Sequence, residues 1–280
     1  SINYLGDLQP MYFYRLMNIA SLFFFLVLGF GCSKSFVYHP EKKLVATPAD
    51  AGLPFEDLYL TAEDGVRING WFVPFQGSEG VLLWFHGNAG NMGNRIDLLQ
   101  HLHEELKLNI LIIDYRGYGN SEGEVSEEGT AKDALAAYDD LLSRPDIHPE
   151  RIFAFGQSLG AAVAVRLATE SRIGGLILEA PFTSVKAMTA EIFPWLPFKG
   201  LISIKYDSIR KIKSVQSPLL VMHGDQDRVV PYEQGQQIFE AADTPKTFYT
   251  ITGADHNNTY VVGGPGYFET MKRFIQGIQP

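Results

Sequence analysis

The 280-residue sequence contains a single cysteine, Cys32. One cysteine cannot form a disulfide within the chain, which excludes a small fold held together by disulfides. The sequence also lacks the paired cysteine and histidine spacings of a zinc site, the HExxH motif and the GxxxxGK[ST] phosphate-binding loop. We therefore expect neither a metal ion nor another cofactor to take part in the function.

Positive charge is also scarce, because 23 lysines and arginines stand against 32 aspartates and glutamates, a formal net charge of -9. A surface that follows a phosphate backbone needs a basic stripe, and no such stripe is present. We therefore expect no nucleic-acid partner. Hydrophobic residues make up 46% of the chain, enough for one large domain or two small ones with a sizeable core.

One stretch has no charge at all, residues 16–31, "LMNIASLFFFLVLGFG". Arg15 precedes it and Cys32 follows it, a pattern typical of an export signal. The run is shorter than the roughly 20 residues of a comfortable membrane span. It resembles a bacterial lipoprotein signal in which Cys32 carries the lipid, although Gly29 stands where such signals usually have leucine.

An uncleaved membrane anchor and a buried N-terminal helix are the alternatives for this stretch. If Cys32 is lipidated, or if the run is an uncleaved anchor, segment 1–35 attaches the protein to the extracytoplasmic face of a membrane. The proline-containing segment 36–54 is then expected to be a linker.

From residue 55 onward, short apolar runs alternate with amphipathic ones. Residues 57–74 form two strand-like runs around Glu63-Asp64-Gly65, which predicts a hairpin. The later runs predict about six parallel strands, each followed by a helix or a less regular stretch. They begin at residues 81, 109, 151, 174, 218 and 246. We expect an α/β domain over residues 55–277, with a mostly parallel sheet, an N-terminal antiparallel hairpin, helices on both faces and a short cap insertion at about 182–214.

Two pentapeptides fit the GxSxG pattern of a serine nucleophile on a sharp turn between a strand and a helix: GNSEG at 119–123 and GQSLG at 156–160. Around Ser158, an apolar strand leads directly into the turn and an apolar helix begins directly after it. Around Ser121, extra glycines precede the serine and Glu122 follows it, where a carboxylate would oppose a developing oxyanion. The context favours Ser158 as the nucleophile.

A serine nucleophile needs a histidine base, and the histidine needs an acid. In this topology the chain order is serine, acid, histidine, and His256 in "GADH" is the histidine that follows the last strand. The other histidines are expected to be structural or exposed to solvent. For the acid, Asp225 and Asp227 both lie on the turn after "PLLVMH", and Glu179 is a third candidate.

Five motifs appear in a characteristic order: HGNAGN at 86–91, DYRGYGNSEG at 114–123, GQSLG at 156–160, HGDQDRVVP at 223–231 and GADH at 253–256. Together they resemble the α/β-hydrolase superfamily, and within it the serine-aminopeptidase-like and ABHD-type acyl-protein hydrolases. The resemblance implies that Asp227 is the acid and that the backbone N–H of Asn88 is one oxyanion donor. The elbow itself implies the N–H of Leu159 as the other donor.

The resemblance and the elbow together imply a serine hydrolase that cleaves an ester or thioester through an acyl-enzyme. A serine peptidase with the same three residues is the alternative, and a binding protein on a hydrolase scaffold is a third reading. The cap insertion combines apolar and basic residues, so we expect a small-molecule or acyl-like, lipid-like substrate. These residues are Phe193, Trp195, Leu196, Phe198, Lys199, Lys205, Arg210, Lys211 and Lys213.

Overall fold

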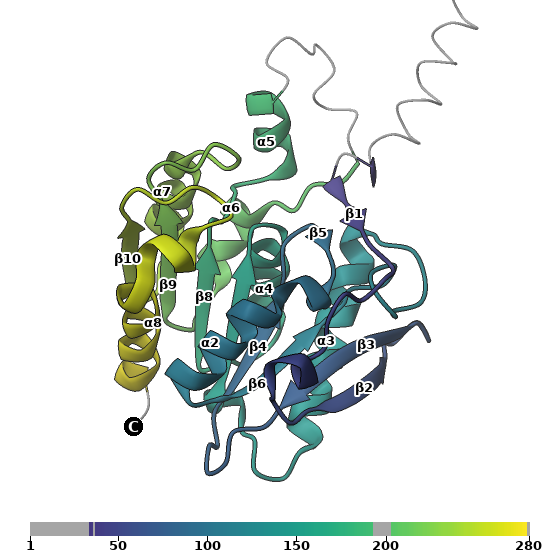
Figure 1. Ribbon diagram of the computed structural model, residues 1–280. Coiled ribbons are helices and arrows are strands. Elements are labelled where there is room, and N and C mark those ends of the chain that lie inside the picture. The colour runs from purple at the N-terminus through teal and green to yellow at the C-terminus, as the bar shows by residue number, and fades with distance from the viewer. Residues whose placement is uncertain (1–33, 36, 193–202, 279–280) are drawn as a thin grey trace, which may run out of the picture.

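The computed structural model describes residues 34–35, 37–192 and 203–278 (Figure 1). Its centre is an eight-stranded sheet with the order β10-β9-β8-β7-β4-β6-β3-β2. Six strands of this sheet run parallel, as the apolar runs predict. They are β4 (Val81–Phe85), β6 (Asn109–Ile113), β7 (Ile152–Gln157), β8 (Gly175–Glu179), β9 (Leu219–Gly224) and β10 (Lys246–Ile251).

The expected hairpin forms the other edge of the sheet. β2 (Glu56–Thr61) and β3 (Arg67–Val73) are antiparallel, and β3 continues the sheet by pairing antiparallel with β6. The turn between them is closed where the Ala62 N–H donates to the Val66 carbonyl over 2.9 Å. The mixed sheet with an N-terminal antiparallel hairpin is therefore confirmed.

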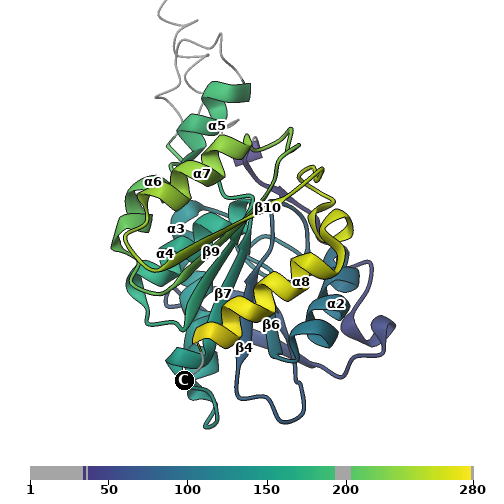
Figure 2. The same cartoon turned by 90° about the vertical axis from the view of Figure 1, so that its left-hand side faces the viewer.

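Helices cover both faces of the sheet (Figures 1 and 2). Side chains alternate along β4: Trp84 joins the buried cluster beneath α2 and α8, whereas Phe85 joins the cluster beneath α3, α4 and α7. Such strands are apolar on both sides, which explains their continuous hydrophobic runs. The helices that cover the two faces are α2 (Ile96–Leu106), α3 (Glu127–Ser143), α4 (Leu159–Glu170), α7 (Tyr232–Ala241) and α8 (Thr259–Ile278), the last of which is broken at Gly264.

Segment 36–54, expected to be a linker, instead packs against the domain over its described part. Tyr38 is only 3% exposed, and Leu44 and Leu53 pack against the buried cluster beneath α2. The short strand β1 (His39–Pro40) pairs in parallel with β5 (Ala89–Gly90) in a separate two-stranded sheet. The prolines indicated a linker, but the apolar side chains between them give this segment a surface to bury.

The described part of the cap has two legs that hydrogen-bond to each other. The Val185 N–H donates to the Lys205 carbonyl over 2.9 Å, and the Ile209 N–H donates to the Thr183 carbonyl over 3.0 Å. The legs contain α5 (Val185–Ile192) and α6 (Ser208–Lys211). Lys205, Arg210 and Lys213 are exposed, and Lys211 is partly buried. The expected apolar residues Phe193, Trp195, Leu196 and Phe198, together with Lys199, lie outside the described residues.

Residues 1–33 of the predicted N-terminal attachment segment also lie outside the described residues, among them Cys32 and the apolar run 16–31. Among the residues that the structure does describe, no helix has the length and apolar character needed to cross a membrane.

We expect Gly160→Ala to destabilise the fold by about 2 kcal/mol or more, because the added methyl group would overpack a site with no free space. A Cβ at Gly160 would lie 1.9 Å from the Phe85 carbonyl oxygen, so backbone would have to move. Gly277→Ala, where no heavy atom lies within 4 Å of the new Cβ, is the matched control and should be neutral or slightly stabilising. Urea denaturation measures both effects, and equal stabilities of the two variants would contradict this account.

Candidate active site

Ser158 lies in the sharp turn between β7 and α4. Its backbone has φ 53° and ψ -111°, a conformation that residues other than glycine rarely adopt. The turn is held where the Ser158 N–H donates to the Glu179 carbonyl over 2.9 Å. Glycine is required on both sides: a Cβ on Gly156 would lie 2.3 Å from the Gly160 carbonyl oxygen. The GQSLG motif thus forms the strained elbow that its sequence predicts.

Ser121 occupies a different environment. Its side chain donates to the Asp114 carbonyl over 2.7 Å and accepts from the Asn69 N–H over 2.8 Å, and the residue is only 1% exposed. A hydroxyl that is buried and engaged in this way closes a turn between β3 and the loop after β6. The GNSEG match is therefore a structural motif.

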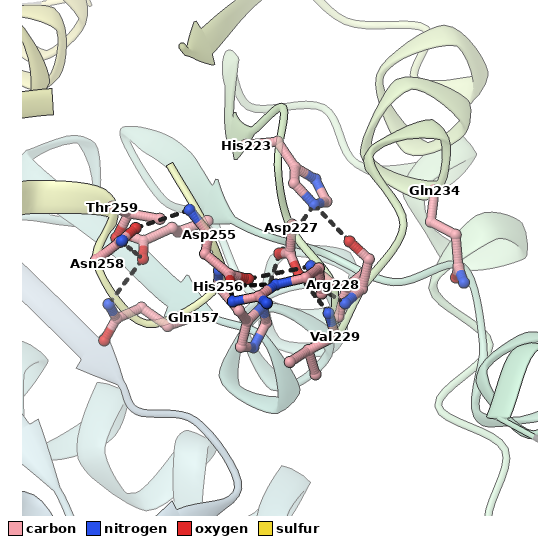
Figure 3. A network of polar contacts seen from close by, with 12 residues as sticks. Gln157, His223, Asp227, Arg228, Val229, Gln234, Asp255, His256, Asn258 and Thr259 are labelled. Atoms are coloured by element: carbon pink, nitrogen blue, oxygen red, sulfur yellow. Dashed lines mark hydrogen bonds and ion pairs between the residues drawn. The ribbon is translucent and has the colours of Figure 1, made fainter. Parts of the chain in front are cut away.

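The carboxylate of Asp227 and the imidazole of His256 are brought together at the carboxyl ends of β9 and β10 (Figure 3). His256 Nδ1 donates to Asp227 Oδ2 over 2.7 Å. The side chain of Asp227 has no exposed surface, and its other oxygen accepts the N–H groups of Val229 and Val230, each over 2.8 Å.

Burial alone would raise the pKa of Asp227, but the hydrogen bonds from His223 and His256 together hold this pKa well below its usual range. Asp227 is therefore ionised at every pH near neutrality. An ionised partner keeps the His256 proton on Nδ1 and leaves Nε2 free to accept a proton.

The other two acids considered from the sequence do not contact the His256 ring. Asp225 accepts the Gly253 N–H over 2.7 Å, which ties the acid loop to the turn after β10. Glu179 is buried at the end of β8 and faces different partners. The geometry therefore distinguishes Asp227 from its neighbour two residues earlier, a distinction that the residues alone left open.

His223, which the sequence placed among the structural or exposed histidines, is fully buried and contacts the candidate acid. Its Nε2 lies 3.0 Å from the Val230 carbonyl oxygen and 3.3 Å from Asp227 Oδ2. Both neighbours are acceptors, so we assign the ring proton to Nε2. His223 thus holds the acid loop against the end of β9. The signal in the sequence is the four-residue spacing between the histidine and the aspartate in HGDQD.

Sequence reasoning also missed the buried contacts of Glu179. Its Oε1 accepts from Gln157 Nε2 over 3.1 Å and from Thr259 Oγ1 over 2.7 Å, and its Oε2 accepts from the Tyr267 hydroxyl. Burial, followed by the charge of Glu179, raises the pKa of Tyr267 well above its usual value, so the phenol keeps its proton. One carboxylate therefore joins the residue before Ser158 to the segment that follows His256.

One expected oxyanion donor belongs to the residue after the serine, and the loop that carries the other comes close to the serine. The Leu159 N–H stands in the first turn of α4, where backbone N–H groups have no partner within the helix. The loop after β4 also reaches the serine, because a Cβ on Gly87 would lie 3.9 Å from the Cβ of Ser158. Asn88 follows Gly87, and its side-chain amide donates to the Val37 carbonyl over 3.0 Å.

The carbonyl of Asn88 has two further donors. It accepts the His39 N–H over 3.0 Å and the Tyr118 hydroxyl over 2.8 Å. These bonds hold the peptide group between Asn88 and Ala89 in place.

Among the described residues, no hydrogen bond joins Ser158 Oγ to His256. Ser158 ends β7, whereas Asp227 and His256 follow β9 and β10, and β8 lies between them in the sheet. Catalytic hydrogen bonds are often long in a free site and shorten when substrate binds.

Comparison with known proteins identifies the family of this chain. Residues 76–206 match the family model described as serine aminopeptidase, S33. The chain is 35% identical over 260 residues to the α/β-hydrolase domain-containing protein WAV2 of Arabidopsis thaliana, covering 86% of this chain and 84% of WAV2. It is also 35% identical over 246 residues to protein bem46 of Schizosaccharomyces pombe, covering 84% and 81%. The chain belongs to the α/β-hydrolase superfamily.

Solved structures agree on the fold. An esterase of Pyrococcus furiosus superposes with a TM-score of 0.73 at 24% identity, covering 86% of this chain and 98% of the esterase. An acetyl xylan esterase of Paenibacillus sp. R4 superposes with a TM-score of 0.67 at 21% identity, covering 91% and 93%. The resemblance seen in the five motifs is therefore confirmed at the level of superfamily and fold, and membership of this family supports hydrolase activity.

We expect Asp227→Asn to lower kcat by about three to four orders of magnitude, because an amide neither stabilises the charged imidazole nor holds its tautomer. Asp225→Asn is the matched control on the same turn, and it should keep at least about a tenth of the activity because its oxygen binds only the backbone of Gly253. Steady-state kinetics on a p-nitrophenyl ester separates the two variants. A larger loss at Asp225 than at Asp227 would reverse the assignment.

Proposed function

We propose that the protein is a serine hydrolase that cleaves an ester or thioester through an acyl-enzyme. The observation that carries this proposal is the 2.7 Å contact between His256 Nδ1 and Asp227, at the same sheet edge as the strained elbow of Ser158. Buried carboxylate, histidine and projecting serine are the three parts that nucleophilic acyl transfer requires.

The proposed reaction begins when Ser158 Oγ attacks the carbonyl carbon of the substrate and its proton passes to His256 Nε2. Asp227 stabilises the resulting imidazolium through Nδ1–H, and the oxyanion is held by the N–H groups of Asn88 and Leu159. Collapse of the tetrahedral intermediate breaks the ester or thioester bond, and His256 returns the proton to the departing alcohol or thiol. Water then hydrolyses the acyl-enzyme by the same route in reverse.

A serine aminopeptidase is the second candidate, favoured by the description of the matching family model. Such an enzyme needs a carboxylate at the mouth of the site to pair with the free amine of its substrate. Three described acids at this edge already have partners. Asp255 pairs with Arg228, and backbone N–H groups together with this arginine lower the pKa of Asp255 to about 2, while Asp227 binds His256 and Glu179 is buried. Glu233, in the first turn of α7, is the exposed carboxylate beside the acid loop. Because the three acids closest to His256 in the loops and strand ends are engaged, we favour the ester or thioester over the peptide.

The N-terminal sequence supports a membrane location for this hydrolase. The apolar run 16–31 followed by Cys32 fits either a lipidated cysteine or an uncleaved anchor on the extracytoplasmic face. Three exposed basic residues on the described legs of the cap, Lys205, Arg210 and Lys213, suit an anionic lipid surface. An acyl or lipid-like substrate is consistent with both features.

We expect a fluorophosphonate probe to label the wild-type protein and to leave Ser158→Ala unlabelled, because the probe bonds covalently to an activated serine hydroxyl. Ser121→Ala is the matched control and should remain labelled, since that hydroxyl is buried in backbone hydrogen bonds. Ester turnover should fall by several orders of magnitude in Ser158→Ala alone. Labelling that survives Ser158→Ala and disappears in Ser121→Ala would contradict the proposed nucleophile.

A further inference from the structure

The segment that enters the domain from the N-terminal side passes directly beside the proposed oxyanion loop. We call residues 37–43 the N-terminal strap. Its Val37 carbonyl accepts the Asn88 side-chain amide over 3.0 Å, and its His39 N–H donates to the Asn88 carbonyl over 3.0 Å. Further along the strap, the Glu41 N–H donates to the Gly90 carbonyl over 3.1 Å. These bonds fix the start of the domain at the active-site end of the sheet.

The length of chain before the strap limits how far the domain can lie from the apolar run. Five residues lie between Gly31, the end of that run, and Val37, so the two are six residue steps apart. A fully extended chain of six steps spans at most about 20 Å. Lipidated Cys32 lies one residue closer to Val37 than Gly31 does. If Cys32 is lipidated, or if the apolar run is an uncleaved anchor, the membrane boundary therefore lies within about 20 Å of the contact between Val37 and Asn88.

Exposed apolar side chains occur on the loop that holds the acid and in the first turn of α8, just after the histidine. Val229 is 48% exposed two residues after Asp227, and Val261 and Val262 are 64% and 43% exposed shortly after His256. Val261 is the most exposed large apolar side chain of the described part of the chain. Apolar groups at this end of the molecule suit contact with a lipid surface.

We propose that the mouth of the active site faces the membrane, and that the substrate is a lipid ester whose acyl chain lies in that membrane. The short connection disfavours a folded acyl-protein as substrate. The gap between the membrane and the site is about 20 Å at most. A compact 100-residue domain has a radius of gyration of about 13 Å, which corresponds to a diameter of roughly 30 Å, so it would not fit. The inference rests on the proposed serine hydrolase activity and adds the substrate class and its direction of approach.

The test lengthens the connection and leaves the site intact. A flexible Gly/Ser linker of about 20 residues, inserted between Ser33 and Lys34 of the full chain, adds about 25 Å of root-mean-square reach. The protein is reconstituted in phosphatidylcholine vesicles that contain methylumbelliferyl oleate. We expect the rate on this vesicle-held ester to fall about tenfold. A longer tether lets the domain move over a larger volume, which lowers the effective concentration of the active site at the membrane surface. The rate on soluble p-nitrophenyl butyrate should stay within about twofold, because the linker touches no site residue.

The matched control places the same linker between Gln76 and Gly77, in the exposed turn before β4. This insertion lies at the other end of the strand from Asn88 and should change neither rate. A second pair of variants probes the apolar contact: Val261→Ser with Val262→Ser should lower only the vesicle rate, whereas Leu142→Ser, 39% exposed at the end of α3, should not.

The outcomes separate this inference from the proposed function. An unmodified chain that hydrolyses neither ester overturns the serine hydrolase itself. Hydrolysis of the soluble ester with a vesicle rate that is unchanged by the Ser33–Lys34 linker overturns the membrane-facing mouth alone. Failure of the full chain to float with the vesicles also overturns it, and preferential hydrolysis of an acylated soluble protein over the vesicle-held ester replaces the lipid with a protein substrate.

Discussion

The close crossing of α4 over the central strands determines the arrangement of this site. Gly160 lies so near the Phe85 carbonyl that no side chain fits between helix and strand. This contact brings the first turn of α4 directly onto the ends of β4 and β7, so the chain must reverse within one residue. That residue is Ser158, and its positive φ is the local cost of the crossing. The same crossing brings the loop after β4 close to the serine.

The second half of the site depends on contacts between strand ends. Asp227 and His256 belong to loops after different strands, and each loop is fixed separately. His223 and Asp225 hold the acid loop, while the buried carboxylate of Glu179 holds the segment after His256 through Thr259. Because Glu179 also binds Gln157, the elbow and the histidine segment share one buried anchor. Preorganisation of this kind lets a site stabilise a developing charge without rearrangement.

The sequence was enough to predict the sheet, most helices and the elbow, because each of these depends on a local pattern. Continuous apolar runs identified parallel strands, and strand-to-helix context separated Ser158 from Ser121. The linker assigned to 36–54 was wrong, since burial of Tyr38 depends on elements distant in sequence, such as Tyr206 at 3.0 Å from its hydroxyl. The contacts of Glu179 with Thr259 and Tyr267 were missed for the same reason, whereas the contact between His223 and Asp227 is local and its signal is the spacing in HGDQD. The catalytic roles of Ser158, Asp227 and His256 and the lipidation of Cys32 stay predictions.

The buried ring of His223 also constrains a residue outside the site. Its Nε2 faces two acceptors, whereas its Nδ1 has no hydrogen-bond partner, and a Cβ on Gly235 would come within 2.2 Å of that nitrogen. A buried polar atom without a partner costs about 1–3 kcal/mol of folding stability. The molecule therefore keeps a weak point beside its acid. Any side chain at position 235 would also collide with the His223 ring that contacts Asp227, so the glycine on α7 is tied to the acid of the site although it lies outside it.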